Sequence, residues 1–357
     1  MITISLCMIV KNESSVLGRI LEQMSDIADE IIIVDTGSSD NTKEIASHYT
    51  SLIFDFPWIQ DFSAARNFAC SKASMDYWIW LDADDVIRPK HQRKLLELKN
   101  TLSPATDVVM MRYLTGFDEQ DNVTFSYERE RLLKNNRGFV WRGKVHEAVT
   151  PGGVILHSDI EIEHRKQKAK DPDRNLTIYE SMISNGESLE PRHQFYYGRE
   201  LYYHGQYKQA ISVFEHFLDE EEGWIENKID ACLHLSHCYR ALGKKTEAAA
   251  ALLHSLILDV PRPQICCALG SLMMERQAYR QAIYWYEQAL SNPDNEQSGG
   301  FFQKDFQDYI PHIQLCVCYD RLGDQERAVE YHKLAMADKP DSPAVKQNQE
   351  YFQNLFA

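Results

Sequence analysis

The stretch Tyr77-Trp78-Ile79-Trp80-Leu81-Asp82-Ala83-Asp84-Asp85-Val86 decides how the first half of this chain folds. An apolar, largely aromatic run, as long as a buried strand, ends abruptly in three carboxylates. Such a strand crosses a core and delivers Asp82 and Asp84 to the carboxyl end of a sheet, where open α/β folds bind their ligands. Carboxylate oxygens at that place suit a hard divalent cation. Taken alone, such an acidic triplet is more often a solvated turn after a strand.

Short apolar runs alternate with amphipathic stretches up to about residue 110. Helices are expected over residues 17–24 and 62–73, and another from Pro89, because apolar residues recur there at helical spacing or a start signal is present. Strands are expected at Ile4–Val10, Ile31–Val34, Leu52–Phe54, Tyr77–Leu81 and Val108–Met111. This alternation predicts a mostly parallel α/β sheet with helices on both faces. From Val123 to Glu163 short strands with glycine breaks predict an antiparallel appendage.

The second half of the chain is helical and repetitive. Four segments align on a small residue followed twelve positions later by alanine: Gly198 and Ala210, Ser236 and Ala248, Gly270 and Ala282, Cys316 and Ala328. The second and third anchors lie 34 residues apart, and the larger of two insertions falls around Asn292–Gly300. A helix–turn–helix unit of this length resembles the tetratricopeptide repeat, so an all-α repeat solenoid is expected.

These patterns predict four regions along the chain. Residues 1–165 form the α/β domain, and 166–190 form a basic linker with a connecting helix. Residues 191–341 form four tetratricopeptide-like repeats, and 342–357 form a C-terminal capping helix. Tyr351, Phe352 and Leu355 give that last helix an apolar face for covering the open end of the array.

Composition excludes several classes of protein. The chain has 357 residues, enough for two domains, and a net charge of −15, which argues against binding to nucleic acid or anionic lipid. No apolar run reaches 18 residues and the N-terminus lacks a basic leader, so we expect a cytoplasmic protein without a membrane span. The eight cysteines include no C-x-x-C pair, which favours reduced, buried thiols over a zinc site or disulfides.

Further polar groups fall where an open α/β sheet would gather them at one edge. Glu13 follows the first strand, Asp35 ends the second, and Arg66 lies in the helix that starts at Phe62. Lys144-Val145-His146-Glu147 follows the fifth strand. Each has an ordinary alternative: a turn hydrogen bond for Asp35, a surface ion pair for Arg66, an interior place for the histidine. Their coincidence favours a single functional crevice.

At this point the motifs resemble a known family. Residues 1–165 are similar to a family 2 glycosyltransferase with the GT-A fold, in which D-x-D is the metal motif for the nucleotide sugar. L-C-M-I-V-K-N-E, V-D-T-G-S-S-D-N-T, D-F-S-A-A-R-N and G-K-V-H-E resemble members with C-terminal tetratricopeptide repeats. These include the sublancin- and thurandacin-type S-glycosyltransferases that modify bacteriocin precursor peptides. The resemblance implies inverting transfer of a hexose from a UDP-sugar, with Mg²⁺ or Mn²⁺ as cofactor.

The same resemblance implies roles for individual residues. Asp82 is expected near the ribose and the cation, and Asp84 is expected to bind the cation directly. Glu13 and Asp35 are expected to hold the nucleoside, and Arg66 to contact the base or the diphosphate.

The resemblance also places a general base. Glu147 stands where inverting members carry the carboxylate that deprotonates the acceptor. His164 or His146 would complete the metal shell, and the family pattern favours His164. Asp85 departs from the glutamate usual at its position and is taken as a structural carboxylate.

The repeats suggest how an acceptor would bind. Arrays of this kind form a groove for extended or helical peptides, and Arg199, Tyr202 and Tyr203 line it in the first repeat. The tyrosines could instead pack the junction between domains, and the same helix faces suit a homodimer. The acceptor is expected to be a cysteine or serine of a bacteriocin-type precursor peptide. The alternatives are a cell-surface glycan or lipid-linked sugar acceptor and an inactive scaffold protein.

Overall fold

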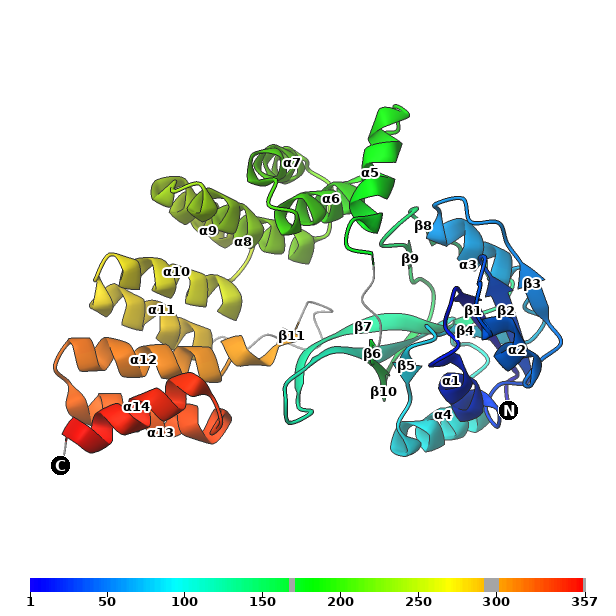
Figure 1. Ribbon diagram of the computed structural model, residues 1–357, viewed down its shortest axis with the longest axis horizontal. Helices are drawn as coiled ribbons and strands as arrows, with labels where there is room; N and C mark the ends of the chain where they lie inside the picture. The colour runs from blue at the N-terminus through cyan, green and yellow to red at the C-terminus, as the bar shows by residue number, and fades with distance from the viewer. Residues whose placement is uncertain (167–170, 292–301, 356–357) are drawn as a thin grey trace. The chain divides into compact units, whose positions relative to one another are not determined.

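The computed structural model of the protein describes residues 1–166, 171–291 and 302–355. The chain divides into two compact units, Met1–Glu187 and Ser188–Ala357. A sheet with flanking helices makes up the first unit, and pairs of helices make up most of the second (Figure 1). In the described part of the chain, no helix combines the length and apolar character that crossing a bilayer requires. The cysteines are free thiols, all buried except the half-buried Cys70.

The first unit is built on ten strands: β1 (Ile4–Val10), β2 (Glu30–Asp35), β3 (Ile53–Asp55), β4 (Tyr77–Trp80), β5 (Asp85–Val86), β6 (Val108–Phe117), β7 (Val123–Lys134), β8 (Trp141–Arg142), β9 (Ala148–Val149) and β10 (Ile155–His164). The main sheet has the order β3-β2-β1-β4-β7-β6-β10-β5, and β8 and β9 form a separate ribbon. Strands β1 to β4 are parallel, as are β6 and β10, whereas β7 and β5 run antiparallel to their neighbours. The predicted mostly parallel α/β sheet is confirmed.

Helices cover both faces of this sheet. They are α1 (Leu17–Met24), α2 (Thr42–Ser47), α3 (Phe62–Cys70) and α4 (Pro89–Thr101), and a further helix, α5 (Arg174–Ser184), comes after β10 in the chain. On one face Ile33 belongs to a cluster with Leu17 and Leu95, from α1 and α4. On the other, Ile32 belongs to a cluster with Ala69 of α3. Because neighbouring residues of β2 are buried on opposite faces, the strand reads as an unbroken apolar run.

The appendage of short strands expected over residues 123–163 is not what the chain forms. Strand β7 is long and lies inside the main sheet between β4 and β6, and β10 pairs with β6 in that same sheet. The antiparallel direction of β7 was predicted, but its central position was not. Its run Glu128-Arg129-Glu130-Arg131 is charged at every position. In the structure the guanidinium groups of Arg129 and Arg131 stack on Trp80 and pair with carboxylates.

The second unit contains the expected helical pairs. Its elements are α6 (Pro191–Tyr203), α7 (Tyr207–Asp219), α8 (Ile225–Ala241), α9 (Lys245–Leu258), α10 (Pro263–Glu275), α11 (Tyr279–Ser291), β11 (Phe302–Gln303), η2 (Lys304–Phe306), α12 (Tyr309–Arg321), α13 (Gln325–Asp338) and α14 (Pro343–Leu355). The first helices of successive pairs contact one another, so α6, α8, α10 and α12 form a continuous layer. The predicted capping helix corresponds to α14. The insertion around Asn292–Gly300 lies outside the described residues.

Small anchors in the repeats allow the two helices of a pair to approach closely. A Cβ added at Gly198 would stand 2.6 Å from the ring of Phe214 on the paired helix. A Cβ added at Gly270 would stand 2.7 Å from the ring of Tyr286 in the same relation. The recurrence that identified the repeat therefore has a steric cause, because a ring of the second helix occupies the space of the missing side chain.

Candidate active site

The loops that follow β1 and β2 are tied together by side-chain hydrogen bonds. The backbone N–H of Asn12 donates to Ser38 Oγ (2.8 Å), and the N–H of Ser39 donates to Asn12 Oδ1 (2.7 Å). The N–H groups of Gly37 and Ser38 both donate to Asp35 Oδ1 at 2.9 Å. The other carboxylate oxygen, Asp35 Oδ2, is buried without a hydrogen-bond partner. A buried acceptor of this kind at the sheet edge suits a donor group of a bound ligand.

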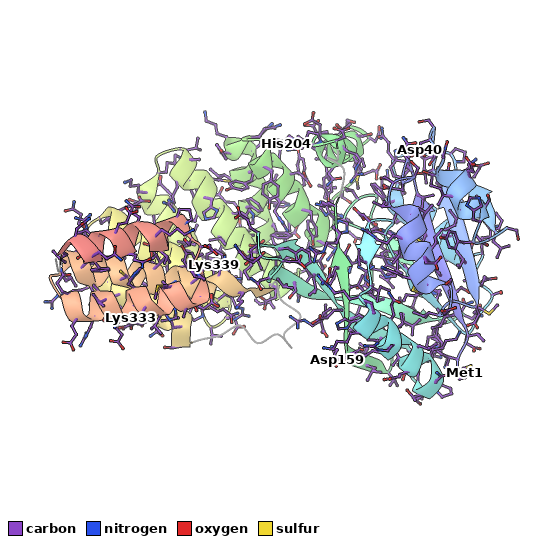
Figure 2. All side chains as sticks on the ribbon, turned by 60° about the horizontal axis from the view of Figure 1, so that its bottom comes forward. Met1, Asp40, Asp159, His204, Lys333 and Lys339 are labelled. Atoms are coloured by element: carbon purple, nitrogen blue, oxygen red, sulfur yellow. The ribbon has the colours of Figure 1, made fainter. Side chains whose placement is uncertain are left out.

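Glu13 lies in the same pair of loops. Its backbone N–H donates to Thr42 Oγ1 (2.7 Å), which joins the end of β1 to the start of α2. Asp40, labelled in Figure 2, accepts from the N–H groups of Thr42 (3.0 Å) and Ser14 (3.2 Å). The structure thus places the two predicted nucleoside residues close to these joined loops, with Glu13 just after β1 and Asp35 at the end of β2.

Helix α3 carries the guanidinium predicted beside the sheet. Asp61 caps its first turn by accepting from the N–H of Ala64 (2.9 Å). One turn on, Arg66 is 8% exposed and lies over the rings of Trp80 (4.9 Å) and Trp141 (4.8 Å). The residue types of D-F-S-A-A-R-N therefore start a helix and direct an arginine inward.

Arg66 connects the acidic motif to the predicted base. Its Nη2 donates to Asp82 Oδ1 (2.9 Å), and its Nε donates to Glu147 Oε1 (2.6 Å). Burial alone would lower the pKa of Arg66, but the charges of Asp82 and then Glu147 raise it. The guanidinium therefore stays charged and holds both carboxylates.

Asn67 fixes the loop that presents Glu147. Its Nδ2 donates to the carbonyl of Trp141 (2.9 Å), and the N–H of Trp141 donates back to Asn67 Oδ1 (2.8 Å). The N–H of Phe62 donates to the carbonyl of Lys144 (2.9 Å). These three bonds join α3 to the β8–β9 ribbon, so Glu147 is held although it lies on a loop.

The acidic motif meets a histidine across the sheet. Strand β5 pairs with the end of β10, and in this register His164 stands opposite Asp85. Within the described residues, Asp82, Asp84, Asp85 and His164 offer metal-ligating atoms that all lie within 4.8 Å of one another. Carboxylate oxygens with one imidazole fit Mn²⁺, and the oxygens alone fit Mg²⁺. The side chains present therefore fit the expected cation.

Charge at this cluster shifts two pKa values. Burial alone would lower the pKa of His164, but hydrogen bonds with Asp84 and Asp85 raise it to about 9. Burial alone would raise the pKa of Asp82, but Arg66 and then His164 hold it below its usual value. At neutral pH the cation-free site therefore contains the imidazolium of His164 near the ionised carboxylate of Asp82.

His146, the other histidine considered as a ligand, lies elsewhere. It adopts a φ of +51°. Its ring stacks on Tyr179 of α5 with the centroids 6.4 Å apart, and its Nε2 lies 3.5 Å from Asn175 Nδ2 of the same helix. The structure brings His164 to the carboxylates and places His146 against α5. Which histidine binds a cation remains a prediction, and the geometry favours His164.

Tyr113 and Arg131 lie at the site and were missed from the sequence. The Tyr113 hydroxyl donates to Asp85 Oδ1 (2.9 Å), and Arg131 Nη1 donates to Asp85 Oδ2 (3.2 Å). Burial, then the charges of Asp85 and Asp82, raise the pKa of Tyr113, which keeps its proton available for donation. The sequence feature that could have pointed to these contacts is the charged run in β7, because a strand with such residues can be buried only if each charge has a partner.

The three predicted acceptor residues lie on α6. Arg199 Nη2 donates to the hydroxyl of Tyr203 (3.0 Å), which is 60% exposed. Tyr202 packs against the next repeat, with its ring 5.2 Å from that of His234 and 6.1 Å from that of His237. Tyr203 is thus available at the surface of the second unit, whereas Arg199 is half-buried and Tyr202 joins two repeats. Their role in acceptor binding remains a prediction.

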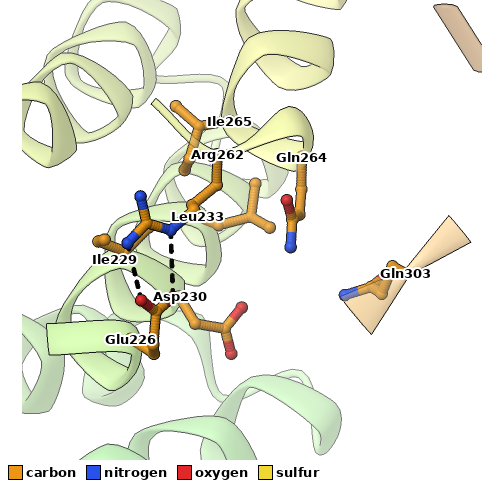
Figure 3. A pocket seen from close by; sticks show the side chains of 8 residues that line it. All are labelled: Glu226, Ile229, Asp230, Leu233, Arg262, Gln264, Ile265 and Gln303. Atoms are coloured by element: carbon orange, nitrogen blue, oxygen red, sulfur yellow. Dashed lines mark hydrogen bonds and ion pairs between the residues drawn. The ribbon is translucent and has the colours of Figure 1, made fainter. Parts of the chain in front are cut away.

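A pocket lies farther along the same array (Figure 3). Arg262 Nη2 pairs with Glu226 Oε1 (2.7 Å) on one wall, and the carboxylate of Asp230 lies beside this pair. The lining residues are Glu226, Ile229, Asp230, Leu233, Arg262, Gln264, Ile265 and Gln303. Burial alone would lower the pKa of Arg199, but the charge of Asp230 raises it.

Comparisons with known proteins agree with these two units. Residues 5–162 match the model of glycosyl transferase family 2, and residues 229–259 match that of the tetratricopeptide repeat. A TPR repeat-containing protein of Synechococcus elongatus is 27% identical over 344 residues, which span 96% of this chain and 68% of the relative. The SPbeta prophage-derived glycosyltransferase SunS of Bacillus subtilis is 27% identical over 255 residues, 65% of this chain and 58% of the relative.

A third relative is named for a different biosynthetic role. The lipopolysaccharide core biosynthesis glycosyltransferase LpsC of Rhizobium meliloti is 27% identical over 164 residues, 43% of this chain and 58% of the relative. The chain thus spans less than two thirds of either matched glycosyltransferase. The predicted combination of a family 2 glycosyltransferase domain with C-terminal tetratricopeptide repeats, similar to the sublancin-type enzymes, is confirmed.

Proposed function

We propose that this chain, a family 2 glycosyltransferase domain followed by tetratricopeptide repeats, moves a hexose from a UDP-sugar to a peptide side chain with inversion. The acceptor is a cysteine or serine of a bacteriocin-type precursor peptide. The observation that carries the proposal is the bridge from Asp82 through Arg66 to Glu147. The predicted cation site and the predicted base then flank one guanidinium. Such closeness is needed if the leaving diphosphate and the attacking acceptor are to react at a single centre.

Each side chain then has one task. Asp84 and His164, with Asp82 beside them, would hold a divalent cation, which stabilises the charge on a departing diphosphate as a Lewis acid. Asp35 offers its unpartnered Oδ2 to the nucleoside. Arg66 fixes Glu147 Oε1, and Glu147 removes the proton from the attacking thiol or hydroxyl. Attack opposite the leaving group inverts the anomeric carbon, and the proton ends on Glu147.

The repeats supply the acceptor surface. Tetratricopeptide arrays commonly receive peptides, and interface hot spots are rich in arginine and tyrosine. Arg199 and the exposed Tyr203 provide both residue types on α6. The polar pocket with Asp230, Glu226 and Arg262 extends this surface. The match to glycosyltransferase SunS over 65% of this chain supports a peptide acceptor through the resemblance to the sublancin-type enzymes. The same helix faces also suit a homodimer.

A second candidate changes only the acceptor. The match to LpsC, which is named for lipopolysaccharide core biosynthesis, favours a cell-surface glycan or lipid-linked sugar acceptor. That match spans 43% of this chain, less than the match to SunS. Transfer to a sugar acceptor with no transfer to cysteine or serine peptides would decide for this candidate.

Donor hydrolysis by the purified full chain tests the proposed centre. UDP release from UDP-hexoses should require Mg²⁺ or Mn²⁺ and should be abolished by Asp84→Ala. Asp159→Asn is the matched control, because Asp159 is an exposed carboxylate paired with Lys94 away from the site. Cation-independent hydrolysis, or an active Asp84→Ala variant, would remove the metal from the proposal.

Matched cysteine and serine peptides test the base. A thiol already has some thiolate near neutral pH and is intrinsically nucleophilic, whereas a serine hydroxyl needs a base. Glu147→Gln should therefore lower transfer to serine by about 10²–10⁴-fold and transfer to cysteine by much less. Equal losses on the two peptides would count against Glu147 as the base.

A further inference from the structure

Asp85 stands among the metal-ligating side chains, but its carboxylate is already engaged. Oδ2 accepts from the N–H of Asp82 (3.0 Å) and from Arg131 Nη1 (3.2 Å). Oδ1 accepts from the hydroxyl of Tyr113 (2.9 Å) and lies 3.2 Å from His164 Nδ1. Four partners use the lone-pair sites of a carboxylate, and this one has no exposed area. A cation could reach Asp85 only by displacing one of these partners.

Asp84 differs from Asp85 in this respect. Its Oδ1 lies 3.2 Å from the same His164 Nδ1, but its side chain is 16% exposed, compared with 0% for Asp85. The backbone carbonyl of Asp84 is held by the N–H of Arg165 (3.0 Å) and by Arg19 Nη2 (3.2 Å). The loop is therefore fixed while the carboxylate of Asp84 retains access to solvent, as a ligand for an incoming cation needs.

Arg131 supplies the positive charge that allows Asp85 to be buried. Its guanidinium lies between the rings of Trp80 (3.7 Å) and Tyr113 (4.1 Å), and Nη1 also donates to the carbonyl of Trp80 (3.2 Å). Its Nε and Nη2 are buried without hydrogen-bond partners. A buried arginine with unused donors costs stability, so this pair is a poor device for holding a fold together. The Arg131–Asp85 pair is better explained by the groups that Asp85 holds in place.

A β-bulge places Arg131 there. Val109 pairs with Leu132, but the next residue, Met110, pairs with Glu130, so Arg131 is the extra residue of β7. Bulges redirect side chains and are frequent beside active sites. The local irregularity of β7 thus serves the contact with Asp85.

We propose that Asp85, neutralised by Arg131, is a positioning residue and not a ligand. It holds the two ends of the cation site together: the backbone of the Asp82 turn through Oδ2, and the ring of His164 through Oδ1. A carboxylate that hydrogen-bonds a ligand histidine fixes the orientation of its ring. The inference rests on the proposed function in one respect, namely that the site binds a divalent cation.

The affinity of the full chain for Mn²⁺, without donor or acceptor, tests this role. Titration with detection of free Mn²⁺ by electron paramagnetic resonance gives the affinity directly. Asp85→Asn keeps the shape but removes the charge. Asp85→Asn combined with Arg131→Met removes the buried pair together, so that no guanidinium is left uncompensated. Both variants should bind Mn²⁺ about 10–100-fold more weakly than the wild type, as expected when a residue that orients a ligand is lost.

Asp29→Asn is the matched control. The carboxylate of Asp29 accepts from the buried Lys99 Nζ and from the N–H of Ile4, each at 2.8 Å, on the same unit but away from the site. Asp29→Asn should also lower the stability of the protein, because it breaks a buried ion pair. It should leave the affinity for Mn²⁺ unchanged. Ring ¹⁵N shifts of His164 report the hydrogen bonding at its Nδ1, which should change in the Asp85 variants and not in Asp29→Asn.

Two results would overturn the inference. The first is that the double variant binds Mn²⁺ within about twofold of the wild-type affinity, which would show that Asp85 does not organise the cation site. Loss of binding in Asp85→Asn as complete as in Asp84→Asn would make Asp85 a ligand. A wild type that binds no Mn²⁺ would refute the proposed metal dependence itself, which is a different failure from either of these.

Discussion

Raising the pH should destabilise the cation-free protein through a single histidine. His164 has a pKa of about 9 in the folded chain, because its bonds to Asp84 and Asp85 outweigh burial. An unfolded histidine titrates near pH 6.5, so the difference of about 2.5 units corresponds to about 3 kcal/mol of stability. A raised pKa gives stability that is complete below about pH 6.5 and is lost as the pH rises through about 9. The side chain is only 8% exposed, so solvent screening removes little of this value.

Cation affinity should change in the opposite direction over the same range. A metal ligand must be the neutral imidazole. With a pKa of about 9, roughly 1% of His164 is neutral at pH 7 and about half at pH 9. The apparent affinity for Mn²⁺ should therefore rise about 50-fold between these two pH values, with release of a proton on binding.

Urea unfolding of EDTA-treated protein, followed by tryptophan fluorescence between pH 6 and 9.5, measures the stability term. Calorimetric titration with Mn²⁺ measures the affinity for the cation. His164→Gln should flatten both pH dependences. His91→Gln is the control, because burial lowers the pKa of His91, so its contribution falls at acid pH and leaves the alkaline range unchanged. The reasoning fails if wild type and His164→Gln lose stability in parallel above pH 7, or if the affinity for Mn²⁺ does not change with pH.

Three further variants test the local geometry. Asn67→Ala removes both hydrogen bonds to Trp141 and should lower transfer by about 10–100-fold at unchanged donor affinity, measured as kcat and donor KM. Asp35→Asn can place an amide donor at the buried Oδ2 and should weaken UDP binding about tenfold or more by calorimetry. Gly198→Ala puts a methyl group 2.6 Å from the Phe214 ring and should destabilise the second unit by about 1–3 kcal/mol in urea while donor hydrolysis persists.

Features with a local cause could be predicted from the sequence. Strand β1 has the expected bounds, because seven apolar or small residues in a row need no distant partner to be recognised. Asp61 and the run after it predict a helix start, and the spacing of Gly198 and Gly270 predicts the repeats. The acidic end of β4 could be identified because residues adjacent in sequence are adjacent in the site.

Features that depend on distant partners needed the tertiary structure. His164 and Asp85 lie 79 positions apart, and only the pairing of β10 with β5 brings them together and leaves His146 against α5.

The sequence by itself thus determined the two kinds of unit, the D-A-D motif and the residue types of a transferase site. The tertiary structure decided which histidine joins that motif, that Arg66 bridges Asp82 and Glu147, and that Arg131 lies buried within the sheet. The physical reason is that hydrophobic periodicity and the spacing of small residues in the repeats depend on residues that are close together in the sequence. Burial of a charge, by contrast, is favourable only when a partner from another strand is within reach.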